Sequence, residues 1–168
     1  ATNSIGTAYG DDITFTTTPV PVLPTLTTAS ATKISQATAS SGGNISSDGW
    51  APITARGVCW STNPDPTIAN GKTSDGTGIG SFISNLSGLT SNTTYYVRAY
   101  ATNSVGTEYG NSIIFTTSEI STPSVTTIEP FNVLAKSAGC GGNVTSDGGS
   151  EVFRRGVCWS QLNSIPTL

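Results

Sequence analysis

Three segments of this chain return about 100 residues later, and this repetition is the strongest constraint on its fold. Residues 1–17 (ATNSIGTAYGDDITFTT) and 101–117 (ATNSVGTEYGNSIIFTT) are identical at 12 of 17 positions, at an offset of 100. GGNISSDG at 42–49 returns as GGNVTSDG at 141–148, and RGVCWS at 56–61 returns at 155–160, both at an offset of 99. Self-similarity at a fixed period marks a structural unit that is copied along a chain. One unit must therefore fold within about 93 residues plus a short linker.

The phase of the repeat divides the chain into unequal parts. Residues 24–117 are the complete unit, 1–17 correspond to the C-terminal strands of a preceding repeat, and 123–168 to the N-terminal half of a following one. A Pro-rich linker (18–23) and a second linker (118–122) separate these parts. Neither end-piece has the strands that would bury its apolar face. We therefore expect a window of a longer tandem array, or ends completed by neighbouring copies, and not a stand-alone three-domain protein.

The complete unit is patterned as an all-β domain. Val, Ile, Tyr and Phe alternate with polar residues in short runs, and breaks such as SSDGW, STNPDP and SDGTG carry turn residues. Seven short strands in about 93 residues are typical of a Greek-key sandwich of the fibronectin type III or immunoglobulin kind. The strands are predicted at 25–34, 36–46, 53–61, 66–73 (a weak edge strand), 79–86, 94–103 and 107–117.

One long run resembles a known family. GLTSNTTYYVRAYATN at 88–103 resembles the corner and following strand of fibronectin type III domains, in which a Leu is followed six residues later by a Tyr. The resemblance implies that Leu89 packs in the core and that the Tyr95 hydroxyl bonds backbone upstream, as a tyrosine corner. The sequence departs from vertebrate type III domains because it lacks their Trp on the second strand. We expect Trp60, on the third predicted strand, to supply the large side chain that this Trp supplies in vertebrate domains.

Longer signatures narrow the resemblance. GVCWS, NPDPT, DGTG, LTSNTTYYVRAYATNSVGTEYG and FTT are similar to type III-like repeats of very large secreted surface proteins of Bacteroidetes-type bacteria. That likeness covers the whole chain. It implies a modular spacer or adhesin that is secreted and stands at the cell surface, without one fixed activity.

Composition argues against several other functions. The chain has no His, which removes the commonest general base and metal ligand. Seven scattered Lys and Arg residues against ten Asp and Glu give no electrostatic footprint for nucleic acid. No apolar run approaches the roughly 18 residues of a membrane-spanning helix. We therefore expect no enzyme activity, no cofactor, no nucleic-acid partner and no membrane insertion in this segment.

The three cysteines fall unevenly on the repeat. Cys59 and Cys158 occupy the same repeat position, whereas Cys140 aligns with Ser41. Cys59 is thus alone in the complete unit, where a buried free thiol is the expected state. Two readings of the last half-unit stay open: Cys140 and Cys158 are separate thiols, or they form a disulfide across the sandwich.

Two further groups suggest binding sites, each with a structural alternative. Asp65, Asn70 and Asp75 could offer oxygens to Ca²⁺, although their spacing lacks the alternation of a calcium loop and suits plain turns. An aromatic set with Arg98 close by could stack on a sugar, or could form cross-strand pairs on a solvated sheet. This set comprises Trp50, Trp60, Tyr96, Tyr100 and Tyr109.

The leading functional hypothesis is a non-catalytic structural repeat of an extracellular stalk, adhesin or filament. Its partners would be neighbouring repeats or copies of the same protein, with strand complementation between subunits as a specific version. The alternatives are a module that binds surface glycans or proteins, and an accessory spacer domain of a secreted carbohydrate-active enzyme.

Overall fold

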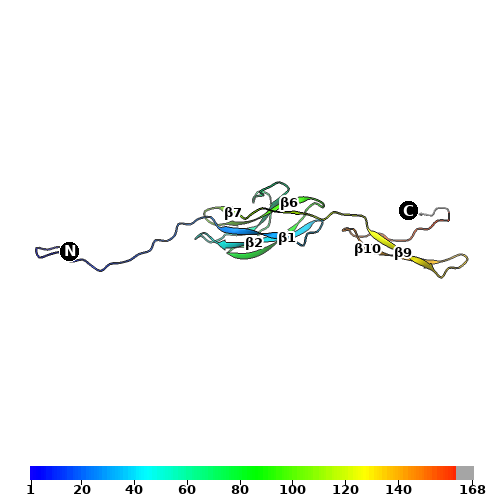
Figure 1. Ribbon diagram of the computed structural model, residues 1–168, viewed down its shortest axis with the longest axis horizontal. Helices are drawn as coiled ribbons and strands as arrows, with labels where there is room; N and C mark the ends of the chain where they lie inside the picture. Colours follow the sequence, from blue (N-terminus) through cyan, green and yellow to red (C-terminus); the bar gives the residue numbers. More distant parts are fainter. Residues whose placement is uncertain (162–168) are drawn as a thin grey trace.

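The computed structural model describes residues 1–161, so that the last part of the segment 123–168 lies outside the described residues. It shows a β-sandwich in the middle of the chain, an extended N-terminal stretch on one side and a two-stranded hairpin on the other (Figure 1). All regular secondary-structure elements in residues 1–161 are β-strands. The predicted all-β sandwich is confirmed, but it has eight strands and not the expected seven, because the last predicted strand is divided in two.

Two antiparallel sheets face each other in the sandwich. The first has the order β1-β2-β5, formed by Thr25–Thr32, Thr38–Ser47 and Gly80–Ser87. The second has the order β4-β3-β6-β7, and β8 also pairs with β6. Its strands are Gly71–Lys72, Ala55–Ser61, Thr94–Thr102, Thr107–Tyr109 and Ile113–Thr116.

The last predicted strand, 107–117, is divided into β7 and β8, because β1 intrudes between them. A Cβ at Gly110 would stand 2.5 Å from Thr28 Oγ1 and 2.7 Å from the Thr28 nitrogen. The Thr28 hydroxyl accepts a hydrogen bond from the Ala99 nitrogen at 3.0 Å, and the Thr28 nitrogen donates to Asn111 Oδ1 at 3.1 Å. Thr28 therefore takes a place in the ladder of β6 that a continuous last strand would fill.

The predicted edge strand at 66–73 is mostly loop. Only β4 pairs with β3, through Cys59 with Lys72 and Trp60 with Gly71. Asn70 donates its backbone nitrogen to Thr67 at 2.9 Å, and Asn70 Oδ1 accepts from the Thr67 nitrogen at 2.9 Å. This local turn uses the backbone groups that a longer strand would need.

The core lies between the sheets and follows the period-two pattern. Inward side chains of β5 and β6 are buried, while their neighbours, except Tyr100, are exposed or half-buried. Leu26, Ile45 and Val58 meet them from the other strands. The core also contains Ala39, Ile53, Phe82, Leu86, Leu89, Tyr95, Val97, Ala99, Ala101 and Phe115.

Residues 124–146 reproduce the first hairpin of the sandwich. β9 (Ser124–Phe131) and β10 (Gly139–Ser146) pair in the register of β1 and β2 shifted by 99 residues. Leu26 opposite Ile45, for example, corresponds to Val125 opposite Val144, and the register shifts fall at the same places. The burial differs: Leu26 is 9% exposed and Val125 69%. The hairpin thus has the pairing of the sandwich without the second sheet that would cover it.

The N-terminal stretch also keeps its local structure without a sheet. Asn3 Oδ1 accepts from the nitrogens of Ile5 and Gly6 at 2.9 and 3.1 Å. Asn103 Oδ1 accepts from Val105 and Gly106 in the same way, at 2.9 and 3.2 Å. The turn of the ATNS segment is therefore set by its own residues, whereas burial of the strands is set by partners.

We predict that Gly43→Ala destabilises the sandwich, because a Cβ there would stand 2.6 Å from Ala99 Cβ and 2.7 Å from the Thr27 oxygen. Overpacking of this kind lowers the free energy of unfolding by about 1–3 kcal/mol. Urea unfolding followed by circular dichroism measures it. Gly106→Ala is the control, because its Cβ would meet only the tip of Leu23 at 3.2 Å. Equal midpoints for both variants would contradict the close approach of the sheets.

Candidate functional site

The outer face of the five-stranded sheet gathers several chemistry-bearing side chains. β3 and β6 pair Cys59 with Arg98, and the alternation that sends Val58 and Ala99 inward sends Cys59, Arg98 and Tyr100 outward. Cys59 and Tyr100 are nevertheless buried. The loop before β4 and residue Thr73 after it cover them, so this face is a second, smaller packed layer.

Hydrogen bonds fix the covered groups. The Cys59 thiol donates to the Pro66 oxygen at 3.3 Å, and the Tyr100 hydroxyl to the Thr73 oxygen at 2.7 Å. Burial raises the pKa of Cys59 to about 11, and it also raises the pKa of Tyr100, with a smaller contribution from the charge of Asp75. A thiol with a raised pKa stays protonated at neutral pH and is a poor nucleophile. The geometry gives Cys59 a packing role.

Arg98 fastens the loop to the end of the sheet. Its Nε donates to the Gly110 oxygen at 2.9 Å, and its guanidinium lies 4.8 Å from the centre of the Tyr109 ring. Tyr109 in turn accepts a hydrogen bond from the Ile68 nitrogen at 3.2 Å. The cation and the aromatic ring thus attract each other, and the tyrosine hydroxyl holds the loop.

The five aromatic residues proposed as a stacking platform do not lie together. Trp60 packs, half-buried, against the core, whereas Tyr100 and Tyr109 lie on the outer face. Trp50 is 70% exposed and belongs to the loop between β2 and β3, next to the end of β6. Tyr96 is near the start of β6, roughly 20 Å from that end at ~3.3 Å per residue.

The candidate calcium ligands each have a separate partner. Asp65 lies 3.9 Å from Arg98 Nη1, and Asn70 caps its own turn as described above. Asp75 Oδ2 accepts hydrogen bonds from Thr73 Oγ1 at 2.6 Å and from Ser84 Oγ at 2.5 Å. Within residues 1–161 no three His, Cys, Asp or Glu side chains gather in a way that could hold a metal ion.

Asp75 has a structural position that the sequence did not reveal. Ser84 is fully buried on the inner face of β5, and Asp75 supplies the acceptor for its hydroxyl. Arg56 donates to the backbone oxygen of Asp75 at 3.2 Å and lies over the Phe82 ring at 5.3 Å. Asp75 thereby joins the loop after β4 to the opposite sheet. An inward-facing Ser on a predicted strand is the signal that could have indicated such a partner.

The tyrosine corner has the geometry that the resemblance implied. The Tyr95 hydroxyl accepts a hydrogen bond from the Thr90 nitrogen at 3.0 Å. Leu89 is buried in the core, and the Tyr95 ring stacks on Phe115 with 5.8 Å between the ring centres. The corner fixes the point at which the chain crosses from β5 to β6.

The two remaining cysteines are not joined. Cys140 lies on β10 and Cys158 follows it by 18 residues, and both are exposed without a disulfide between them. The second reading of these residues, a bridge across the sandwich, is therefore absent from this structure. Val157, beside Cys158, is 49% exposed although its counterpart Val58 is completely buried, because no second sheet faces this segment.

The pole of the sandwich where the chain enters holds a site that the sequence did not suggest. Asn103 is buried, and its Nδ2 donates to the Val22 oxygen at 2.7 Å and to the Asp48 oxygen at 2.8 Å. The Val22 nitrogen donates to the Gly49 oxygen at 2.8 Å. Since Asn103 Oδ1 also accepts two bonds, the whole hydrogen-bonding capacity of this amide is used.

The result is a clamp: the loops 48–54 and 103–106 hold the linker that precedes β1. The feature of the sequence that could have indicated the clamp is the ATNS segment, which occurs at 1–4 and again at 101–104. This clamp joins the sandwich to the segment that precedes it through side-chain as well as backbone hydrogen bonds. We take it as the candidate functional site.

Comparisons with known proteins return fold likenesses only. No family model matches the chain, and no curated protein matches it. A crystal structure of domains from titin is 20% identical with a TM-score of 0.42, covering 60% of this chain and 33% of that one. This chain thus spans about a third of that structure's length. The sensor domain of the anti-sigma factor RsgI4 in Pseudobacteroides cellulosolvens is 11% identical with a TM-score of 0.43, covering 59% of this chain and 98% of that one.

Residues 1–161 contain no helix long and apolar enough to cross a membrane.

Tyr95→Phe is expected to lower the free energy of unfolding by about 1 kcal/mol, because it removes the acceptor of the Thr90 nitrogen while keeping the ring. The measurement is the urea midpoint of the folded chain. Tyr96→Phe serves as the matched control on the neighbouring, outward position of β6. If the Tyr95 variant were as stable as the control, the corner bond would have no energetic role.

Cys59 is expected to resist alkylation in the folded chain. With its pKa raised to about 11, roughly one thiol in a thousand is ionised at pH 8, and the loop also blocks access. In a Cys158→Ser background, iodoacetamide at pH 8 should label Cys140 and spare Cys59, as read by peptide mass spectrometry. Urea should expose Cys59, and in the folded chain its labelling rate should rise only as the pH approaches 11. Equal labelling of Cys59 and Cys140 at pH 8 would contradict the burial.

Proposed function

We propose that this chain is part of an extended, non-catalytic extracellular array, in which type III-like sandwiches follow one another end to end as a stalk, adhesin or filament. The observation that carries the proposal is the repeated clamp. The Ser121 nitrogen donates to the Gly148 oxygen at 2.8 Å, as the Val22 nitrogen donates to the Gly49 oxygen at 2.8 Å, 99 residues earlier. The backbone bond of the clamp is thus present at both linkers, and the Asn103 side-chain bonds are added at the first.

The second linker, 118–122, is held at both ends. The Ser118 nitrogen donates to the Ser35 oxygen at 3.0 Å, and the Ser118 oxygen accepts from the Asn92 nitrogen at 3.1 Å. Its other end is held by Gly148, as described above. A linker of five residues with both ends bonded to neighbouring units restricts how those units turn relative to each other.

The first linker is stiffened by its composition. Pro19, Pro21 and Pro24 fix their own φ angles and bias the preceding residues toward extended backbone. Figure 1 shows this stretch running away from the sandwich as an extended chain. Each unit then adds about 35–40 Å of length, from strand rises of ~3.3 Å per residue plus loops.

The exposed apolar residues at both ends fit the same proposal. Ile13 and Phe15 are 89% and 86% exposed, whereas Phe115, the counterpart of Phe15, is 5% exposed inside the sandwich. We propose that 24–117 is the complete repeat, and that 1–17 and 123–168 belong to repeats whose other strands come from adjoining sequence or from copies of this chain. The few charges and abundant Thr, Ser and Gly of the chain support an extracellular setting.

Head-to-tail polypeptides made of one, two and three copies of residues 18–117 test the array. The 117-to-18 junction reproduces the native 17-to-18 junction, because 1–17 repeats 101–117. Small-angle scattering should show the maximum dimension growing by about 40 Å per added copy. In a control, a Gly-Ser linker of equal length replaces 18–23 and should broaden the distance distribution. Compact two-copy and three-copy particles would refute the proposal.

A further inference from the structure

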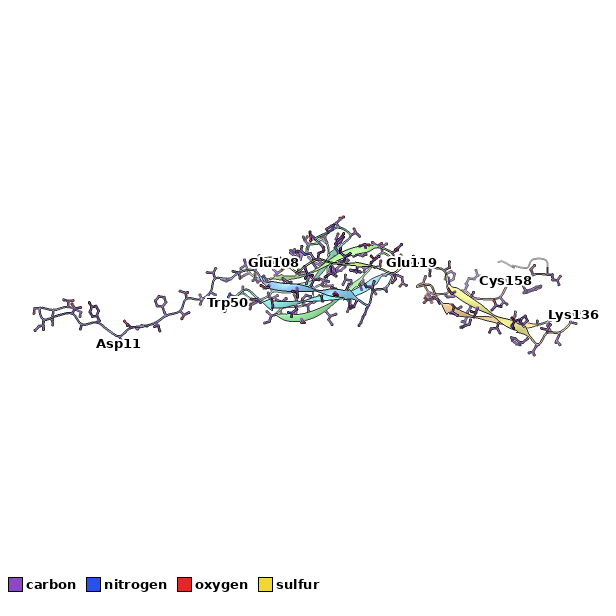
Figure 2. The ribbon with its side chains drawn as sticks, viewed as in Figure 1. Asp11, Trp50, Glu108, Glu119, Lys136 and Cys158 are labelled. Atoms are coloured by element: carbon purple, nitrogen blue, oxygen red, sulfur yellow. The ribbon has the colours of Figure 1, made fainter. Side chains whose placement is uncertain are left out.

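The pole that carries the linker clamp also carries an exposed indole. Trp50 is 70% exposed and lies at the end of the sandwich where the N-terminal stretch enters (Figure 2). Val22 and Val105, from the two other segments of this pole, are 54% and 49% exposed. Nothing inside residues 24–117 covers this small apolar surface, which we call the Trp50 surface.

The following unit shows what the same position contacts. Gly149 is the counterpart of Trp50 at an offset of 99. A Cβ placed on Gly149 would collide with the side chain of Gln36, so Gln36 lies directly on this glycine. Gln36 belongs to the turn between β1 and β2, at the pole of the sandwich opposite to Trp50. Position 149 of one unit therefore touches the first turn of the unit before it.

Trp50 and Gly149 lie in turns of similar backbone conformation, so that their surroundings can be compared. Gly49 and Gly148 have φ of 69° and 70°, and Trp50 and Gly149 have φ of 65° and 84°. Each turn is closed by the preceding Asp: the Trp50 nitrogen donates to Asp48 Oδ1 at 3.0 Å and the Gly149 nitrogen to Asp147 Oδ1 at 2.8 Å. A bulky side chain in the left-handed region is uncommon, so Trp at this place in the turn calls for a reason outside the turn.

We propose that the Trp50 surface is the docking site for the preceding repeat, and that Trp50 packs on the turn of that repeat equivalent to residues 33–37. The inference rests on the proposed array and specifies its joint. The occupant is another copy of this kind of unit, since the observed joint at Gly149 is formed by such a unit. Where Gly149 lets Gln36 lie flat on the backbone, Trp50 offers an apolar plane on which an amide side chain can stack.

The test uses the two-copy polypeptide of residues 18–117, whose sandwich contains the complete core. Nuclear magnetic resonance resolves the indole N–H of each Trp50. We expect the indole of the second copy to shift relative to the one-copy protein, while that of the first copy does not. Gln36→Ala in the first copy should abolish this shift. Ile83→Ser, on the exposed outer side of β5, is the control and should leave it unchanged.

Scattering on the same samples separates the two proposals. If the two-copy particle is elongated but the Trp50 indole of the second copy does not shift, or shifts equally in the Gln36→Ala variant, the proposed docking of Trp50 is wrong and the array proposal is unaffected. A compact two-copy particle would overturn the array itself. An elongated particle with a shifted indole that depends on Gln36 supports both.

Discussion

β6 is the strand on which the rest of the sandwich depends. It pairs with β3 on one side and with both β7 and β8 on the other, and its inward side chains occupy the middle of the core. Its outward side chains Arg98 and Tyr100 contact Asp65 and Thr73, which lie on either side of β4 in the segment that covers this face. Its start is fixed by the tyrosine corner, and its end passes into Asn103 and the linker clamp. The core, the outer layer and the pole with the linker clamp are therefore connected through one strand of nine residues.

The sequence predicted those features that depend on local pattern. Alternation along 94–103 places Tyr95 and Val97 on one face and Tyr96 and Arg98 on the other, and in the structure the first face lies in the core. The fold class followed from the number and spacing of such runs. What the sequence could not supply were contacts between distant residues: Thr28 interrupting the last strand, or Asp75 reaching the buried hydroxyl of Ser84. Such contacts have no fixed spacing in the chain, so no periodicity reveals them.

The candidate site illustrates the same division. Asn103 lies in a turn, which its Oδ1 closes, as that of Asn3 does without any sheet. The other half of the same amide binds Val22 and Asp48, 81 and 55 residues away. Asp65, Asn70 and Asp75 were close enough in sequence to suggest a shared ion, yet the fold gives each a different partner. Closeness in the sequence therefore did not indicate which residues share a partner: the three candidate calcium ligands are near in sequence and have different partners, whereas the linker clamp joins residues that are far apart.

Differences between the repeats indicate which parts of the joint are fixed. The linkers TPVPVL and SEIST share little, but both are held through backbone groups, which any residue except proline can supply at the donor position. Gly49 and Gly148 are retained because a Cβ there would strike the backbone oxygens of Val22 and Ser121. At the next residue, Gly149, the nearest atoms to a Cβ belong to the Gln36 side chain and not to the linker backbone, and this residue differs between the repeats, being Trp50 in the first and Gly149 in the second. In the proposed array, a backbone clamp that tolerates different linkers, followed by one variable contact residue, would allow each joint to differ in its packing while every unit keeps the same fold.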